Sequence, residues 1–385
     1  MTATPRALTA GHADAQSLSQ GPAAAALRAV EQARSGTATI LEAARLLGLV
    51  TGVPVDGGTH TSLYYGAPTV GVLLHAAAPL HPAFGAAASE IDKHVQAIVR
   101  RRLTASVGHA PESFTDFDLL YGLTGLGSYL LHHLPASDEL GAVLDYVVAL
   151  THDRSDGPRT VPGWWALCDP DTSVPAPGGH ANNGMAHGAA GMLALLARAS
   201  MRGHQVGGHH DAIRRLLAWF DRWQYDTGSG PAWPPWITLP DLDSGTTGRQ
   251  HRHRPRPSWC YGTPGIGRAQ QLAAAAIGDC ARREFAEHAL TSCTEAANLA
   301  LLTEPGICHG TAGLDQTLFR AGADMTNQAS KALLTTYLHR RTTTQAGPTS
   351  DDGFITGGAG AALVHDTLTA ATAPATGWDT CLLLI

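Results

Sequence analysis

Hydrophobic residues in this chain recur at the three- and four-residue spacing of amphipathic helices rather than with the alternation of strands. One stripe consists of Ile91, Val95, Ile98 and Leu103. The helical pattern begins near Ala23 and returns along the chain in runs rich in alanine and leucine. It predicts an all-α protein whose small side chains let neighbouring helices pack closely.

A Gly-x-x-Gly motif precedes most of these runs and marks the points where loops enter helices. Successive copies are 47 to 74 residues apart, which is long enough for a helical hairpin in each repeat. Stacked hairpins bury one face against the next, and a closed ring would gather their loops at one end, called the mouth below. The copies lie at residues 121–125, 187–191, 261–265, 309–313 and 356–360, and an earlier one at 65–68 lacks the second glycine.

Three stretches interrupt the helical pattern. Residues 1–22 are rich in small and polar residues and predict a flexible N-terminal tail, followed by one large domain over 23–385. Residues 153–184 and 227–257 are rich in proline, so helices cannot run through them. We expect these two stretches to be irregular insertions with loops or small strands near the mouth.

Composition excludes several classes of protein. Charged residues make up only 15% of the chain and its net charge is −6, which argues against a nucleic-acid surface. No apolar stretch is long enough to span a membrane or to serve as a secretory signal. The six cysteines are too sparse for a disulfide scaffold, so we expect a cytoplasmic, reduced protein.

The candidate reactive residues of the chain are Cys260, Cys308 and His309. Cys260 and the pair Cys308–His309 occupy the same place in two copies of the glycine-marked repeat. The loops of a closed ring would bring them together at the mouth. Two thiols and one imidazole are zinc ligands, and three protein ligands with an open fourth position are the pattern of a catalytic zinc site. We therefore predict one Zn²⁺ per chain.

Such a site is suited to activating an incoming thiol. A free thiol is only a few per cent ionised at neutral pH, and metal binding deprotonates it. The alternative is that the three residues are ordinary core residues, since free cysteine is often buried as a small hydrophobe. Their equivalent places in the repeat argue against this alternative.

Four segments together resemble the lanthionine synthetase C family, the lanthipeptide cyclases, and the resemblance covers about residues 60 to 385. The segments are GlyMetAlaHisGly at 184–188, TrpCysTyrGly at 259–262, CysHisGly at 308–310 and TrpAspThrCysLeuLeuLeu at 378–384.

The resemblance implies an α/α toroid with two rings of seven helices each and zinc at the mouth. It implies Michael-type addition of peptide cysteine thiols to dehydroalanine or dehydrobutyrine, which forms thioether rings. The partner would be a dehydrated precursor peptide. At 385 residues the chain has no room for the dehydratase domains of multifunctional synthetases, so we expect a class I cyclase served by a separate dehydratase. A further hypothesis is that this chain associates with that dehydratase or with a transporter at the membrane.

The resemblance also assigns roles to residues. Cys260, Cys308 and His309 match the family's zinc ligands, and His187 matches its acid/base residue. Tyr261 matches the tyrosine that follows the first ligand.

For two further assignments, a neighbouring residue of the same type is an alternative. Asp118 matches the family's active-site aspartate, but Asp116 lies close by. Arg256 fits its active-site arginine, but Arg252 and Arg254 lie alongside.

Each of these residues has a chemical role and a simpler structural one. His187 titrates near neutral pH and suits proton transfer, yet a lone histidine in a loop is more often structural. Asp118 would orient that histidine, or would cap a helix. Arg256 would stabilise an enolate, whereas the arginine cluster would equally suit a solvated loop or a peptide-docking surface. Tyr261 would line the mouth, or only pack there.

Two other functions remain for a chain with these residues. A member of the same family would add glutathione to dehydrated residues, and the zinc ligands do not separate this activity from cyclisation. A non-catalytic member would serve as a peptide-binding scaffold of a synthetase complex, which the retained ligands and His187 argue against. A toroidal prenyltransferase is disfavoured because its zinc set includes an aspartate.

Overall fold

The fold is seen in a computed structural model. It describes residues 14–19, 21–106, 108–171, 173–246, 256–343 and 351–385.

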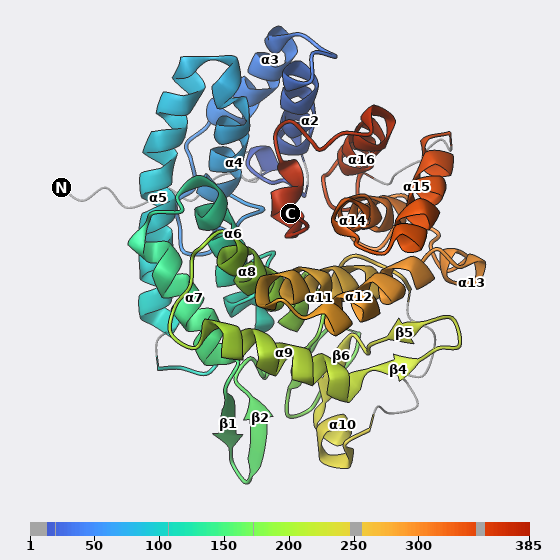
Figure 1. The fold of residues 1–385 in the computed structure, drawn as a ribbon. Coiled ribbons are helices and arrows are strands. Elements are labelled where there is room, and N and C mark those ends of the chain that lie inside the picture. Colours follow the sequence, from blue (N-terminus) through green and yellow to red (C-terminus); the bar gives the residue numbers. More distant parts are fainter. Residues whose placement is uncertain (1–13, 20, 107, 172, 247–255, 344–350) are drawn as a thin grey trace, which may run out of the picture.

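Seven predominantly buried helices form a closed inner ring in the described residues (Figure 1). Each helix contacts the next one in this ring, and the last contacts the first. A helix that is apolar around most of its circumference needs neighbours on all sides, which a closed double layer provides. The inner helices are α2 (Pro22–Arg34), α4 (Ala67–Ala77), α6 (Leu123–His133), α8 (Ala189–Met201), α11 (Thr263–Ile277), α14 (Thr311–Asp324) and α16 (Gly358–Ala370).

An outer layer of amphipathic helices surrounds this ring, and each outer helix packs on the inner helix that precedes it. The helix α9 buries Ala212, Leu216, Phe220 and Trp223 along one face, at helical spacing. The all-α toroid expected from the sequence is therefore confirmed. The described outer helices are α3 (Ile40–Thr51), α5 (Pro82–Ser106), α7 (Asp138–Leu150), α9 (His209–Trp223), α12 (Cys280–Ser292) and α15 (Gln328–Thr342).

The described part of the chain thus has seven inner and six outer helices, where seven of each were expected. The difference arises at the end of the chain, because the residues after α16 turn inward instead of forming an outer helix. Short helical turns complete the described elements: η1 (Ala78–Leu80), η2 (Phe114–Asp116), α10 (Leu239–Ser244), α13 (Ala296–Leu299) and η4 (Trp378–Leu382).

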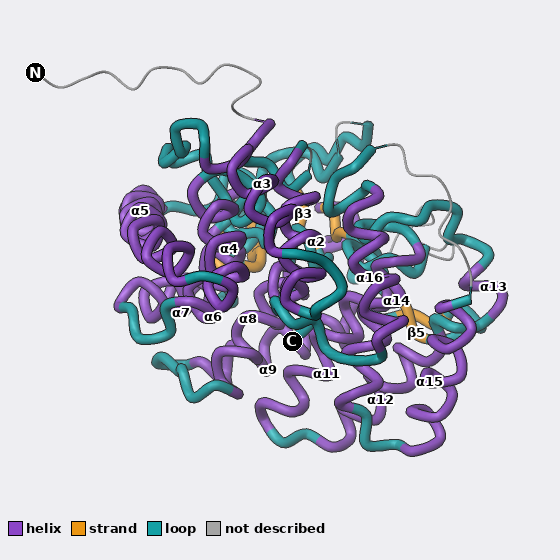
Figure 2. The backbone as a smooth tube through the Cα atoms, turned by 90° about the horizontal axis from the view of Figure 1, so that it is seen from above, coloured by secondary structure: helices purple, strands orange, loops and turns teal. Residues whose placement is uncertain are grey.

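The C-terminal segment, residues 378–385, lies in the middle of the ring and is seen there in two perpendicular views (Figures 1 and 2). The hydroxyl of Tyr64 donates to the carbonyl oxygen of Cys381 at 2.5 Å. The indole of Trp259 donates to the carbonyl oxygen of Leu382 at 3.1 Å. These bonds join loops from different repeats to the centre of the toroid.

Every inner helix begins directly after a glycine, as the motif predicted. The repeat before α2 was not recognised in the sequence, because Ala24 replaces the second glycine and the residue before Gly21 is neither tyrosine nor histidine, as it is in most copies. The residues that precede the seven helices are Gly21, Gly66, Gly122, Gly188, Gly262, Gly310 and Gly357.

The second glycine of the motif is needed because another backbone segment approaches it closely. A Cβ on Gly313 would lie 1.8 Å from the carbonyl oxygen of Ile307, and Gly360 meets an equivalent oxygen at 1.8 Å. In the copy before α4 this place is taken by Thr69, whose hydroxyl donates to the carbonyl oxygen of Leu63 at 3.0 Å. The motif therefore encodes the packing of each loop on its own helix.

Backbone hydrogen bonds join neighbouring loops around the mouth. In each of these bonds a backbone amide donates to a carbonyl oxygen of the next loop, over 2.8–3.2 Å. The donor and acceptor residues are Leu119 and Ala186, Ala186 and Cys260, Cys260 and Cys308, and Cys308 and Ile355. Loops that lie far apart in the sequence are thereby held in a fixed order.

Residues 14–19 take part in the same arrangement, although they fall within the expected flexible tail. The amide of Leu18 donates to the carbonyl oxygen of Tyr64 at 3.0 Å, and its own carbonyl accepts from Phe354 at 2.8 Å. Gln16 and Leu18 are fully buried. The packed fold therefore starts earlier than predicted, because this segment fills a place between two loops of the ring.

Small antiparallel sheets of two strands each lie in or at the border of both proline-rich insertions. Two of these are local hairpins, whereas β3 of the first insertion pairs with β6 of the second. The described strands are β1 (Asp153–Asp156), β2 (Arg159–Pro162), β3 (His180–Asn182), β4 (Tyr225–Asp226), β5 (Pro231–Ala232) and β6 (Trp236–Thr238).

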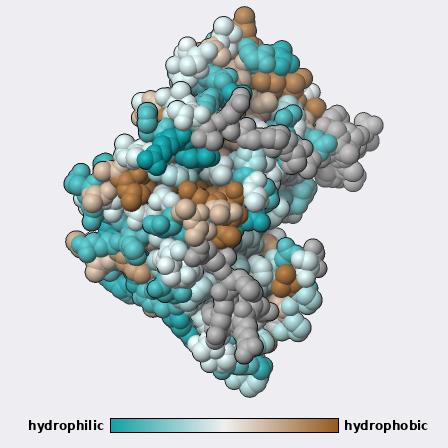
Figure 3. Space-filling view, turned by 90° about the vertical axis from the view of Figure 1, so that its right-hand side faces the viewer, coloured by the Kyte–Doolittle hydropathy of each residue, from teal (hydrophilic) through white to brown (hydrophobic). Residues whose placement is uncertain are grey.

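The surface is predominantly polar on the face shown in Figure 3, where apolar residues appear in separate areas rather than as one broad belt. Among the described helices, none combines the length and the apolar character that crossing a membrane requires.

Candidate metal centre and active site

The thiols of Cys260 and Cys308 and the imidazole of His309 converge at the mouth. One ligand atom from each lies within 4.8 Å of the others, and no second group of this kind occurs in the described residues. Cys260 lies in the loop that leads to α11, and the other two lie in the loop that leads to α14. The amide of Cys260 donates to the carbonyl oxygen of Cys308 at 3.1 Å, so the backbone itself brings the two loops together.

The donors suit a divalent metal that accepts sulfur and nitrogen ligands. The hydrogen bonds from Cys308 and His309 hold the pKa of Cys260 well below its usual range. The thiolate of Cys260 in turn raises the pKa of Cys308 well above its usual range. Two thiols that face each other ionise together only when a cation compensates their charges.

The other ring nitrogen of His309 is engaged by a carboxylate. Its Nε2 lies 2.6 Å from Oε2 of Glu304, whose Oε1 lies 3.6 Å from Nη1 of Arg256. The imidazole of His309 thus contacts a carboxylate through Nε2, while one of its ring nitrogens lies within 4.8 Å of the two sulfurs. Arg256 is placed at the edge of the same cluster, whereas Arg252 and Arg254 lie outside the described residues.

A histidine–aspartate pair forms the second part of the site. The Nδ1 of His187 lies 2.6 Å from Oδ2 of Asp118, and the aspartate is fully buried. The Oδ1 of Asp118 accepts from the amides of Tyr121 and Gly122 at 2.6 and 2.7 Å. Asp118 thus both organises the loop before α6 and orients His187, while Asp116 accepts from backbone amides at 112 and 113 instead.

Aromatic rings surround His187 on several sides. The ring centroids of Phe114, Tyr121 and Tyr261 lie 5.0, 6.0 and 5.7 Å from that of His187. The ring of Tyr121 is stacked on the imidazole, and the tyrosine is half exposed. The histidine itself is only 15% exposed, which leaves limited access for water.

Electrostatics connect the two parts of the site. Burial raises the pKa of Tyr121, and the charges of Asp118 and Cys308 raise it further. Burial also raises the pKa of Tyr261, and the charges of Cys260, Asp118 and Cys308 add to this effect. Tyr261 directly follows Cys260, and its ring centroid lies 5.7 Å from that of His187, so the candidate ligands and the His187–Asp118 pair line one site.

The strands of the insertions contribute to this site as well. The side-chain amide of Asn182, at the end of β3, donates to the hydroxyl of Tyr261 at 3.4 Å. Trp236, at the start of β6, packs edge-on against the ring of Tyr261 with centroids 6.0 Å apart. The expectation that part of the insertions lies near the mouth is therefore met by this sheet.

Comparison with known proteins agrees with this geometry. The family model described as "Lanthionine synthetase C-like protein" matches residues 23–383. The chain belongs to this family.

Individual relatives are distant in sequence but similar in fold. The nisin biosynthesis protein NisC of Lactococcus lactis subsp. lactis is 24% identical over 228 residues, which cover 58% of this chain and 53% of NisC. In that match the chain thus spans about half the length of the relative. The solved structure of nisin cyclase shares the fold with a TM-score of 0.82 at 20% identity, over 96% of this chain and 92% of the other.

Several residues at this site of the lanthionine synthetase C-like chain were not predicted from the sequence. Glu304, Phe114 and Tyr121 contact candidate site residues, and neither Glu304 nor Phe114 belongs to a motif that reveals its place. The one available signal was that Tyr121 occupies the same position in the repeat as His187 and Tyr261. Equivalent positions of the repeat meet at the mouth, which makes this signal usable.

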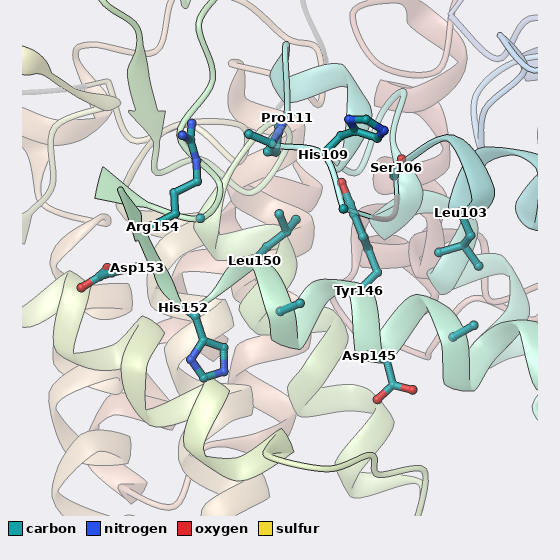
Figure 4. Close-up of a pocket in the computed structure, with 15 residues that line it drawn as sticks. Leu103, Ser106, His109, Pro111, Asp145, Tyr146, Leu150, His152, Asp153 and Arg154 are labelled. Atoms are coloured by element: carbon teal, nitrogen blue, oxygen red, sulfur yellow. The ribbon is translucent and has the colours of Figure 1, made fainter. Parts of the chain in front are cut away.

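A cleft elsewhere on the molecule contains none of the candidate site residues. It has a volume of about 630 Å³ and lies between the C-terminal end of α5, the helix α7 and the strand β1. Tyr146, His109 and Arg154 line it (Figure 4).

Proposed function

We propose that this chain is a zinc-dependent lanthipeptide cyclase. It would add cysteine thiols of a dehydrated precursor peptide to dehydroalanine or dehydrobutyrine residues and thereby form lanthionine or methyllanthionine rings. The observation that carries the proposal is that a three-ligand sulfur and nitrogen group and an oriented histidine line the same mouth. The names of the relatives, a nisin biosynthesis protein and a nisin cyclase, support it.

In this proposal Cys260, Cys308 and His309 hold one Zn²⁺ ion through two sulfurs and one nitrogen. Three protein ligands leave a fourth position open. Bound zinc would supply the substrate cysteine as a thiolate at neutral pH, where a free thiol is only a few per cent ionised.

His187 transfers the proton that the addition requires. Because Nδ1 donates to Asp118, Nε2 is the ring atom left to accept the proton of the substrate thiol. The sulfur forms a bond to the β-carbon, and the electron pair of the double bond moves toward the peptide carbonyl as an enolate. His187 then returns the proton to the α-carbon, so the net reaction adds S–H across C=C.

Arg256 and Tyr261 have supporting roles in this scheme. Arg256 carries a fixed positive charge at the edge of the site, where it would stabilise the developing enolate. The hydroxyl of Tyr261 accepts from Asn182, which fixes its ring beside His187. The aromatic rings around His187 limit the access of water, which strengthens these electrostatic effects.

The proposed partners follow from this chemistry. The substrate must arrive already dehydrated, so a separate dehydratase acts before this enzyme, as in class I systems. We propose that both act in the cytoplasm. Association with the dehydratase or with a transporter is a further hypothesis.

Incubation with a dehydrated precursor peptide tests the proposal. Ring formation leaves the peptide mass unchanged, so the product is treated with a thiol-alkylating reagent, which labels only unreacted cysteines. A cyclase leaves few labelled cysteines, and an exposed-cysteine control, Cys280→Ala, behaves as the wild type. A mass increase in the presence of glutathione would instead identify the adduct-forming activity, and binding of the peptide without any turnover would identify a scaffold.

A further inference from the structure

Glu304 is the one carboxylate within salt-bridge distance of a candidate metal ligand in the described residues. Its Oε2 lies 2.6 Å from Nε2 of His309. Glu304 belongs to none of the sequence motifs, and the proposed reaction assigns it no step. Its position therefore calls for an explanation of its own.

The backbone around Glu304 fixes this position. The carbonyl oxygen of Glu304 accepts from the amide of Thr311, the first residue of α14, at 2.9 Å. A Cβ on the intervening Gly310 would lie only 2.4 Å from that same oxygen, so the loop closes tightly on itself. The carboxylate and the imidazole of His309 are thus held side by side on one short loop.

We propose that Glu304 is a positioning residue for the candidate metal centre. By accepting the Nε2 proton of His309, it fixes the ring tautomer and leaves Nδ1 as the nitrogen with a free lone pair for the metal. A carboxylate bonded to the distal nitrogen of a histidine ligand orients the ring and makes it a stronger donor. The inference rests on the proposed zinc site and names one residue that tunes it.

The second oxygen of the carboxylate has a different neighbour. Oε1 lies 3.6 Å from Nη1 of Arg256, and the two side chains are 50% and 43% exposed. An ion pair exposed to this extent contributes little to folding stability. The same carboxylate thus lies next to both His309 and Arg256.

The test measures zinc affinity by competition with a chromophoric chelator, without any substrate. We expect Glu304→Ala to weaken zinc binding about 10- to 100-fold. Glu304→Gln should weaken it less, because the amide oxygen still accepts the ring N–H but lacks the charge. Glu295→Ala serves as the matched control, since it removes an exposed glutamate from the same connection between helices.

A second measurement separates positioning from general damage to the loop. The melting temperature of the metal-free protein should be the same for wild type and Glu304→Ala. A variant that binds zinc as tightly as the wild type would overturn the role of Glu304, and so would weaker binding accompanied by a lower melting temperature of the metal-free form. Wild-type protein that binds no zinc would overturn the proposed site itself and this inference with it.

Discussion

The carboxylate of Asp118 divides its two oxygens between the backbone and His187. Oδ1 accepts from two amides that precede α6, while Oδ2 lies 2.6 Å from Nδ1 of the histidine. The repeat that builds the ring and the residue that would transfer the proton are therefore joined through one buried side chain. Because the loop holds the carboxylate in place, the orientation of His187 does not depend on a mobile partner.

This relationship leads to a prediction about turnover. His187→Ala should retain zinc and fold but cyclise about a hundred- to ten-thousand-fold more slowly, because proton transfer is lost. Asp118→Asn should also slow turnover, since the neutral amide no longer favours the correct tautomer. Alkylation of the product measures both rates. Asp116→Asn is the control, and normal ring formation by a folded His187→Ala enzyme would show that another residue is the acid.

Substitutions in the arginine cluster should separate an effect on turnover, at Arg256, from an effect on peptide binding, at Arg252 and Arg254. If Arg256 stabilises the enolate, Arg256→Lys should already lower turnover, because a flexible point charge does not reproduce a planar fork of donors. Arg252→Ala and Arg254→Ala should mainly raise the Michaelis constant, and more so at low salt. Steady-state kinetics at two ionic strengths distinguish these effects. Equal increases in the Michaelis constant for all three variants, with turnover unchanged, would assign the cluster to docking alone.

Alanine should have opposite effects on stability at a glycine of the repeat and at a glycine outside it. Gly360→Ala should lower the free energy of unfolding by roughly 1–3 kcal/mol, because the new Cβ would overlap the carbonyl oxygen of Phe354 at 1.8 Å. Gly141→Ala, in the outer helix α7, meets open space and should raise it by about 0.5–1 kcal/mol. Chemical denaturation measures both. A neutral Gly360→Ala would mean that the close approach is not required.

His180 predicts a loss of stability in mild acid. Burial lowers its pKa to about 4, although its bond to the carbonyl oxygen of Cys168 and the charge of Asp169 oppose this. The unfolded chain, with the ordinary pKa of 6.5, therefore binds the proton first. The contribution of neutral His180 to the free energy of unfolding should be fully present above about pH 6.5 and should be lost as the pH decreases toward 4.

Melting temperatures between pH 7 and pH 4 test this expectation. His180→Asn should flatten the dependence, because it removes the titrating group and keeps an amide near the position of Nδ1. His94→Asn, on an exposed face of α5, should leave the dependence as in the wild type. Burial also lowers the pKa of His132 to about 4, so some dependence should persist in both variants. Equal slopes for wild type and His180→Asn would contradict the assignment.

The ring of helices could be predicted because each repeat carries its own glycine motif, which depends on contacts close in sequence. At the second glycine of the motif a carbonyl oxygen occupies the place of a Cβ, as at Gly313, so this close approach leaves a pattern that is visible in the sequence. The candidate ligands were found for the same reason, since Cys260 and Cys308 occupy adjacent loops of the repeat. The copy at Gly21 was missed because Ala24 replaces the second glycine and because the tyrosine or histidine that precedes the first glycine in most copies is absent as well.

Contacts between loops could not be predicted in the same way. Glu304 reaches His309 only because the loop folds back on itself, and no periodicity records that fold. The choice between Asp116 and Asp118 depended on which carboxylate points toward His187, and two loop residues this close in sequence differ only in three dimensions. Leu18 was assigned to a flexible tail because a single extended segment between two loops has no helical pattern.

The zinc requirement of ring formation tests the central claim most directly. Protein stripped of metal with a chelator is incubated with dehydrated precursor before and after addition of zinc, and the free cysteines of the product are counted by alkylation. We predict that the stripped protein forms no rings, that one zinc per chain restores the activity, and that Cys308→Ala is not restored. Ring formation by the stripped protein at the untreated rate, or full zinc occupancy of Cys308→Ala, would contradict the account.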